Sequence, residues 1–208
     1  MVSTFSIACL VSGNGTNLQA IIDSIESGAL SVRIAAVISN VPFVPALERA
    51  RRHGLPHFTV DHREYRDRAS FERALVEIID QSQAKLVCLC GFMRILSPLF
   101  TGQYPGRIIN IHPALLPKFG GKGMYGHRVH QAVLDAKEQV SGCSVHLVDS
   151  EVDHGPVILQ RTVPVLPGDT PDALAARVLE QEHIAYPEAI GLLASGRVTI
   201  NGDRAIIT

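Results

Sequence analysis

The chain has 208 residues, enough for one domain to bury a sizeable core without help from disulfides or metals. Lysine and arginine total 19 against 20 acidic residues, and no basic run occurs, which argues against binding of nucleic acid or another large polyanion. No apolar run reaches the roughly 18 residues of a membrane span, and the amino terminus lacks the positive region of a signal peptide. We therefore expect no membrane association.

The four cysteines, Cys9, Cys88, Cys90 and Cys143, lie mostly in apolar runs. Such positions are typical of buried, reduced thiols, which predicts a cytoplasmic protein. Cys88 and Cys90 lack the two-residue spacer of zinc and redox pairs, so we expect them to pack in the core and to bind no metal.

A glycine loop lies between the first predicted strand, residues 5–11, and the first predicted helix, residues 18–25. Glycines allow a ligand to approach the backbone, and the amides that begin a helix attract a small anion such as phosphate. Gly13 and Gly15 match the first two glycines of a dinucleotide-binding fingerprint, but Leu18 takes the place of the third, so the loop does not have this fingerprint. The alternative is an ordinary turn capped by Thr16 or Asn17. In the phosphate interpretation, bulk at Gly15 would block the ligand.

Strands and helices then alternate, with strands predicted at residues 33–39, 56–60 and 86–90 and helices at residues 45–53 and 69–81. This alternation predicts an α/β fold: a doubly wound, mostly parallel sheet with helices on both faces, in a single domain of residues 1–208. The charged residues of the 69–81 helix are expected to form a solvated face. Residues 91–98 are too apolar for an exposed loop, so they either line a pocket or pack in the core.

Asn110 and His112 lie two apart in an apolar strand that Pro113 ends. Side chains two apart in a strand share a face, and the carboxyl end of a parallel strand is where ligands bind. A carboxamide beside an imidazole can bind an oxyanion and move a proton. Alternatively, both side chains satisfy local backbone groups.

The second half of the chain begins with a glycine-rich loop and a predicted helix at residues 126–136, where His127 and His130 suit a surface helix better than a metal site. Strands are predicted at residues 144–148 and 156–165, then a helix from residue 170 towards residue 193 that Pro187 should kink, then an antiparallel hairpin at residues 198–207. The turn at residues 149–156 carries three carboxylates. They form either a hard-cation site or, as we favour, a solvated turn with one functional acid.

Four segments together resemble the 10-formyltetrahydrofolate-dependent formyltransferase family, and they lie at residues 12–17, 91–98, 110–117 and 153–156. The resemblance covers nearly the whole chain and is greatest to members that act in purine biosynthesis. It implies a Rossmann-like formyltransferase fold, with a phosphate side in the N-terminal half and a folate side in the C-terminal half. The implied reaction transfers a formyl group from 10-formyltetrahydrofolate to the amine of glycinamide ribonucleotide, without a metal. The resemblance also allows a homodimer.

Position by position, the resemblance implies roles for particular residues. The catalytic group would be Asn110, His112 and Asp153. Ribonucleotide contacts would come from Gly13, Asn14, Gly15, Thr16, Asn17 and Glu182. Folate contacts would come from Arg68, Met93, Arg94, Ile95, Leu96, Val145, His146 and Asp153. The loop at residues 120–126 departs from the usual form.

The expected mechanism places Asn110 and a protonated His112 as donors to the formyl oxygen of the tetrahedral intermediate. Asp153 would raise the pKa of His112 to keep it charged, and would help move a proton from the attacking amine to the folate nitrogen.

Three alternatives are a formyltetrahydrofolate hydrolase, a methionyl-tRNA formyltransferase and a phosphate-ligand binding module. The first usually has a regulatory domain, and the second needs an RNA-binding domain and a basic face. The third would not need Asn110, His112 and Asp153 together.

Overall fold

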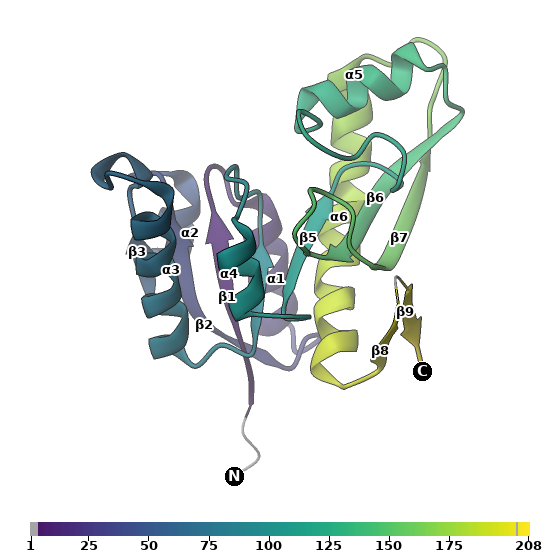
Figure 1. Cartoon of the computed structure of the whole chain (residues 1–208). Helices are drawn as coiled ribbons and strands as arrows, with labels where there is room; N and C mark the ends of the chain where they lie inside the picture. The colour runs from purple at the N-terminus through teal and green to yellow at the C-terminus, as the bar shows by residue number, and fades with distance from the viewer. Residues whose placement is uncertain (1–3, 203) are drawn as a thin grey trace. The chain divides into compact units, whose positions relative to one another are not determined.

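A computed structural model describes residues 4–202 and 204–208. The described residues form two compact units, divided between Ile109 and Asn110 (Figure 1). The first unit contains β1 (Phe5–Val11), α1 (Thr16–Glu26), β2 (Val32–Ser39), α2 (Pro45–Arg52), β3 (His57–Thr59), a 3₁₀ turn (His62–Glu64), α3 (Arg68–Ser82), β4 (Leu86–Leu89) and α4 (Pro98–Gln103). Strand β5 (Ile108–His112) crosses the boundary between the units. The second unit contains α5 (His127–Asp135), β6 (Val140–Leu147), β7 (Val157–Pro164), α6 (Pro171–Ala194), β8 (Val198–Asn201) and β9 (Arg204–Ile207).

Seven strands form one sheet in the order β3-β2-β1-β4-β5-β6-β7, and β8 and β9 form a separate pair. Strands β2 and β4 both run parallel to β1, and β7 runs antiparallel to β6. The predicted class is confirmed: a mostly parallel α/β sheet with antiparallel strands in the C-terminal half. That the whole chain is a single domain stays a prediction.

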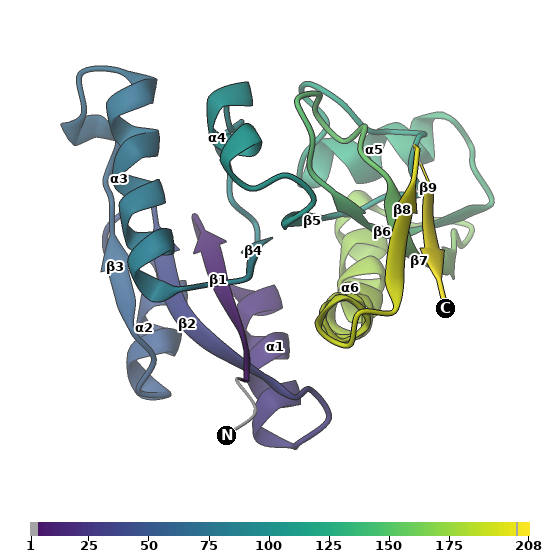
Figure 2. The same ribbon diagram turned by 60° about the horizontal axis from the view of Figure 1, so that its bottom comes forward.

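In the first unit, α1 and α2 cover one face of the sheet and α3 and α4 cover the other (Figures 1 and 2). Strands β1 and β4 are therefore apolar on both sides, and Cys9 of β1 is the register partner of Cys88 in β4. All four cysteines are buried and free, which confirms the prediction of core thiols. The strands after β1 are added first on one side, as β2 and β3, and then on the other side, beginning with β4. The strand order of the sheet therefore changes direction at β1. The carboxyl ends of β1 and β4 are where such a sheet binds ligands.

In the second unit, the long helix α6 packs against β6 and β7. It begins at a Thr170 cap and continues through Pro187 without a break in the helix. The terminal hairpin is confirmed, with Val198 paired to Ile207. Asp203, part of the predicted turn, lies outside the described residues. None of the helices in the described part of the chain is both long enough and apolar enough to span a membrane.

Three local expectations are wrong. Helix α1 begins at Thr16, and its cap is Gly15 in a left-handed conformation, so neither Thr16 nor Asn17 caps it. Glu72 lies on the inner side of α3 and is buried, so the acidic residues of this helix are not all solvated. His130 is also buried, because it lies beside Val129 and Val133 on the packed face of α5.

Candidate active site

The loops that follow β1, β2 and β4 are joined by the hydroxyl of Ser12. Its Oγ donates to Oδ1 of Asn40 at 2.5 Å and accepts from the backbone amide of Met93 at 2.8 Å. Asn40 itself is buried just beyond the end of β2. One side chain therefore fixes the predicted phosphate loop against the predicted folate segment, at the carboxyl ends of the strands.

The two glycines of the first loop have different surroundings. A Cβ on Gly13 would meet nothing within 4 Å, whereas a Cβ on Gly15 would lie 2.6 Å from Cβ of Ala46. Gly15 also has φ +67°, a conformation that L side chains rarely adopt. A larger side chain at Gly15 would therefore clash with α2 and would not point towards a ligand. The expectation that bulk at Gly15 would block the phosphate is wrong. Gly13 is the position where a Cβ would project into open space.

The loop of residues 13–15 leads directly into α1, and the first backbone amides of a helix are groups that can bind an anion. Gly15 supplies no side-chain cap, and the first turn of α1 contains no acidic residue. The Nε atom of Arg49 donates to the carbonyl of Asn14 at 2.8 Å, which holds the loop from the α2 side and brings a positive charge near it. Asn14 is exposed, Thr16 is half-buried and Asn17 is buried. This arrangement can accept a phosphate.

The predicted folate segment is largely exposed. Met93 and Ile95 expose 57% and 55% of their surface, Arg94 is exposed, and only Leu96 is buried. The alternative that residues 91–98 pack in the core is therefore wrong for Met93 and Ile95. Arg68, at the start of α3, reaches the segment and donates to the carbonyl of Ile95. The segment thus offers apolar surface beside a guanidinium group.

Asn110 and His112 both reach Asp153, which confirms that they share a face of β5. Nδ2 of Asn110 lies 3.5 Å from Oδ1 of Asp153, and Nδ1 of His112 lies 3.4 Å from Oδ2. Nε2 of His146, on β6, approaches Oδ1 at 3.5 Å. The side chains of His112, His146 and Asp153 expose 4%, 2% and 8% of their surface. One buried carboxylate therefore lies at the centre of two imidazoles and an amide.

Neighbouring carbonyls fix which imidazole nitrogens carry protons, because a carbonyl oxygen can only accept. Nε2 of His112 donates to the carbonyl of Phe119 at 2.8 Å, and Nδ1 of His146 donates to the carbonyl of Leu147 at 2.8 Å. With that proton on Nδ1, Nε2 of His146 can accept from the Asn110 amide, 3.2 Å away. The expected alternative, local backbone partners, thus holds in part for His112, which binds a backbone carbonyl as well as facing Asp153.

The expectation that Asp153 holds His112 in its charged form is wrong for the free protein. Burial lowers the pKa of His112, and this outweighs the Asp153 carboxylate and the Phe119 carbonyl, which both raise it. Burial would raise the pKa of Asp153, but His146, His112 and the Gly121 amide together bring it below its ordinary value. At neutral pH the pair is therefore a neutral imidazole facing an ionised carboxylate.

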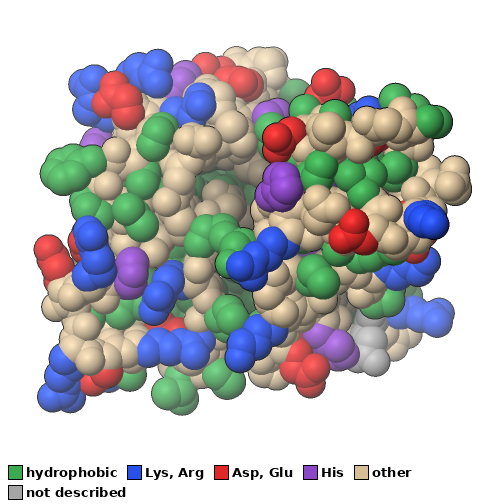
Figure 3. Space-filling model, turned by 90° about the horizontal axis from the view of Figure 1, so that it is seen from above, with side chains coloured by type: hydrophobic (Ala, Val, Ile, Leu, Met, Phe, Trp, Pro, Cys, Tyr) green, Lys and Arg blue, Asp and Glu red, His purple; other side chains and the backbone are tan. Residues whose placement is uncertain are grey.

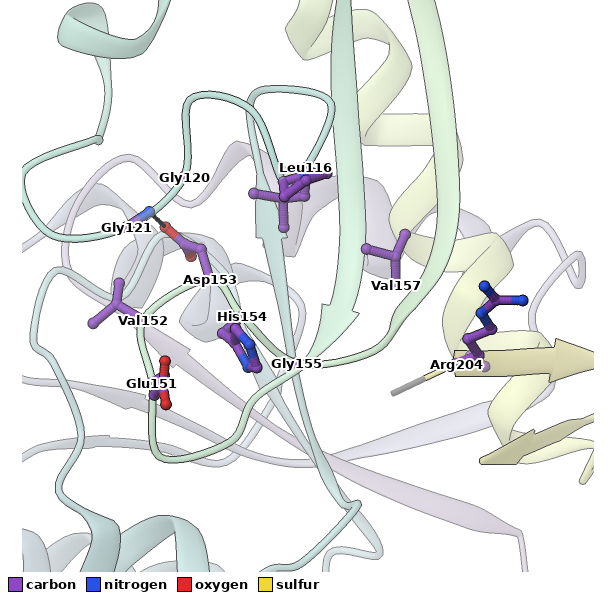
Figure 4. Close-up of a pocket in the computed structure, with 12 residues that line it drawn as sticks. Leu116, Gly120, Gly121, Glu151, Val152, Asp153, His154, Gly155, Val157 and Arg204 are labelled. Atoms are coloured by element: carbon purple, nitrogen blue, oxygen red, sulfur yellow. Dashed lines mark hydrogen bonds between the residues drawn. The ribbon is translucent and has the colours of Figure 1, made fainter. Parts of the chain in front are cut away.

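The turn between β6 and β7 presents Asp153 in an unusual backbone conformation. Its φ is +57°. Its Oδ2 accepts from the amide of Gly121 at 3.0 Å, and Figure 4 marks this hydrogen bond with a dashed line. Gly155 supports the turn, since a Cβ there would overlap the carbonyl oxygen of Leu147. Residues around Asp153 line a pocket of about 520 Å³, formed by Leu116, Pro117, Gly120, Gly121, Glu151, Val152, Asp153, His154, Gly155, Val157, Arg204 and Ala205.

Of the other two acidic residues of this turn, Glu151 is exposed and Asp149 has partners of its own. Asp149 accepts from the amide of Glu151 at 2.8 Å and lies 3.1 Å from Nδ1 of His154, whereas Asp153 faces the histidines. This supports a turn with one functional acid. Within the described residues, no group of three His, Cys, Asp or Glu side chains is placed to hold a metal ion.

Two more predicted contacts are buried. Val145 on β6 has no exposed surface, and Glu182 on α6 exposes 8%. Burial raises the pKa of the Cys143 thiol to about 12, and the negative charge of Glu182 adds to this rise. Cys143 is therefore a neutral thiol, as expected of a structural residue.

Surface charges of both signs are intermingled on the face in Figure 3.

Four contributions were missed from the sequence: Ser12 as a link between loops, Glu72 behind the folate segment, the Phe119 carbonyl on His112, and Gly155 under the Asp153 turn. Spacing could have indicated only Gly155, which lies next to a proline in a turn with a candidate acid. The other three depend on contacts between residues 25 or more apart in the chain, or on a backbone carbonyl.

Comparison with known proteins gives concordant matches. The family model described as Formyl transferase matches residues 5–190. Phosphoribosylglycinamide formyltransferase of Escherichia coli is 43% identical over 200 residues, which cover 96% of this chain and 92% of that protein. The trifunctional purine biosynthetic protein adenosine-3 of Gallus gallus is 44% identical over 194 residues, but this chain spans only 19% of its length. The crystal structure of glycinamide ribonucleotide transformylase 1 from Symbiobacterium toebii superposes with a TM-score of 0.94 at 43% identity, covering 100% of this chain and 95% of that one.

Proposed function

The chain belongs to the formyl transferase family, and we propose that it transfers the formyl group of 10-formyltetrahydrofolate to the amine of glycinamide ribonucleotide in purine biosynthesis. The observation that carries the proposal is the convergence of Asn110, His112 and His146 on the buried, ionised Asp153. The relatives support the choice of acceptor, because two of them are named for it or for purine biosynthesis.

The substrates would bind to the two predicted sets of residues. The ribonucleotide phosphate would take the amides of residues 13–17 at the start of α1, and Glu182 would bind the glycinamide portion. Within the first unit the folate would bind Arg68 and residues 93–96. Within the second unit the predicted folate contacts are Val145, His146 and the turn that carries Asp153. An apolar surface next to a guanidinium suits a ligand that joins aromatic rings to a carboxylate.

The reaction begins when the neutral amine of the ribonucleotide attacks the formyl carbon. A new C–N bond forms, and the electron pair of the C=O bond moves to the formyl oxygen. This oxyanion needs preorganised donors, each typically worth about 3 to 4 kcal/mol in such sites. Nδ2 of Asn110 and Nε2 of His112 are the donors available.

A neutral His112 can already donate, because its Nε2 carries the proton that now binds the Phe119 carbonyl. In the proposed mechanism, the formyl oxygen would replace the Phe119 carbonyl as the acceptor on Nε2. Substrate binding would therefore require that carbonyl to move away. As negative charge grows on the formyl oxygen, the charged form of His112 becomes more favourable, and the proton that Nδ1 would gain is the one that the attacking amine loses. Asp153, 3.4 Å from Nδ1, would then stabilise the imidazolium.

Collapse of the intermediate breaks the bond between the formyl carbon and the folate nitrogen. The attacking amine must lose a proton and the folate nitrogen must gain one, so no proton is consumed overall. Asp153 would carry that proton from the amine to Nδ1 of His112, and then from His112 to the folate nitrogen, directly or through a water.

The cell compartment and assembly belong to the same proposal. We place the protein in the cytoplasm, where four buried free thiols stay reduced. A homodimer stays a prediction that sedimentation would test.

Isotope transfer tests the proposal. With cosubstrate labelled at the formyl carbon, the label should appear on the amine of glycinamide ribonucleotide. Label found only in free formate would show a hydrolase instead.

A further inference from the structure

Glu72 is a buried acid outside the catalytic group. It lies on α3, where its side chain exposes 7% of its surface. Its Oε1 accepts from Nε of Arg68 at 2.9 Å and from the amide of Ser97 at 2.8 Å, and its Oε2 accepts from the hydroxyl of Ser97. A carboxylate taken out of water is costly unless it is paired, so this fully bonded acid has a specific structural task.

Glu72 holds the segment that follows β4. Ser97 is the last residue before α4, and its hydroxyl also caps that helix by accepting from the amide of Phe100. Glu72 thus ties the end of the segment to α3. Glu72 also holds the middle of the segment indirectly, because it binds Arg68, whose Nη2 donates to the carbonyl of Ile95. The segment is fixed at two points by one carboxylate.

The fixed segment keeps Met93 and Ile95 exposed. Apolar side chains in a loop would gain free energy by turning inward, so holding them outward requires an anchor. A covering ligand with an aromatic portion would recover that free energy, and its carboxylate could bind the half-exposed Arg68.

We infer that Glu72 is a positioning residue for the folate cosubstrate: it holds Arg68 and residues 95–97 in the arrangement that binds folate, without touching the reacting atoms. The inference rests on the proposed function for the identity of the ligand. It adds a residue that neither the sequence pattern nor the catalytic geometry assigns.

The test is Glu72→Gln, which keeps the side-chain size but loses the charge that three donors share. We expect the KM for 10-formyltetrahydrofolate to rise about tenfold or more, and the KM for glycinamide ribonucleotide to stay within about twofold. The matched control is Glu77→Gln, an exposed acid on the same helix, which should change neither constant. An equal rise of both KM values would overturn the inference.

Ser97→Ala keeps the inference testable if the Glu72→Gln protein misfolds, because it removes only one hydroxyl contact with the carboxylate. It should raise the folate KM in the same direction by a smaller factor. In an Arg68→Ala background the effect of Glu72→Gln should shrink, because part of it passes through the guanidinium. Fully additive effects would contradict this route.

Direct titration of folate by calorimetry separates this inference from the proposed acceptor. If the parent protein binds folate but does not formylate glycinamide ribonucleotide, the proposed function fails while the Glu72 inference can still be measured. Unchanged folate affinity in Glu72→Gln, together with a lowered melting temperature, would show a purely structural residue.

Discussion

Nδ1 of His112 faces Oδ2 of Asp153 at 3.4 Å, and the other nitrogen of the same ring donates to the Phe119 carbonyl. The ring therefore has its proton on the side away from the carboxylate and an unprotonated nitrogen towards it. This is a resting arrangement that a developing oxyanion would change. Charge on the substrate favours a second proton on the ring, and the carboxylate is already in place to stabilise it.

Removing either member of this pair should lower turnover by about 10² or more, the size expected for loss of an acid, a base or an oxyanion donor. The variants are His112→Ala and Asp153→Asn. The second is a clean substitution, since asparagine tolerates the positive φ at this position as aspartate does. Turnover and circular dichroism would be measured together, with the exposed Asp135→Asn as control. Turnover near that of the parent in either variant would remove the pair from the mechanism.

The titration of His112 gives a second prediction. Burial holds its pKa below the ordinary value while Asp153 opposes that shift, so Asp153→Asn should lower the pKa of His112 further. NMR titration of the imidazole would measure this in both proteins. A His112 pKa unmoved by the substitution would mean that the carboxylate acts only on the proton transfer.

The lowered pKa of His112 also predicts how the free energy of unfolding depends on pH. A histidine whose folded pKa is depressed favours the folded state while it is neutral. Its contribution is present above the unfolded pKa, about 6.5, and is lost as the pH falls through the folded value. Asp153, also depressed, loses its contribution at still lower pH. Urea midpoints should therefore fall on acidification below about pH 6.5, and this fall should be smaller in His112→Ala.

Gly13 and Gly15 should respond differently to alanine. At Gly13 the added Cβ meets open space, so the fold should be unaffected while the KM for the phosphate-bearing substrate rises. At Gly15 the Cβ would press on Ala46 from a left-handed backbone, which should cost roughly 1 to 3 kcal/mol of stability. Urea unfolding and steady-state kinetics would separate the two. The reverse pattern would place the ligand elsewhere.

Gly155→Ala should disturb catalysis through the backbone. The added Cβ would displace the carbonyl of Leu147, which accepts from His146, and would shift the turn that holds Asp153. We expect lower stability and lower turnover together. Gly102→Ala is the control, because a Cβ at that helical position meets nothing within 4 Å and alanine favours helix. A fully active Gly155→Ala protein would show that the turn tolerates movement.

The sequence predicted most of the strands and helices, because apolar periodicity and the glycines and prolines that end elements are local signals. It did not predict α4, and it placed the start of β6 four residues too late. It also placed Asn110 and His112 on one face, since the period of a strand fixes that. Burial was harder to foresee. The positions of Glu72 and His130 depend on which side of a helix meets the core, and a charged or polar residue on that side looks like a surface residue in the sequence.

The protonation state of His112 shows a second limit. A nearby carboxylate suggests a charged imidazole, but the answer depends on the balance between that charge and the loss of water around the ring. Burial is a property of the packed structure, and here it outweighs the single charge. The Phe119 carbonyl is a similar case, because backbone partners from a loop leave no signal in residue identity.

The most direct test of the central claim is the rate of folate product formation with and without glycinamide ribonucleotide, in the parent and in Asp153→Asn. We predict rapid turnover of 10-formyltetrahydrofolate by the parent only when the ribonucleotide is present, with a loss of about 10² or more in the variant. Equal turnover without the ribonucleotide, or none with it, would contradict the account.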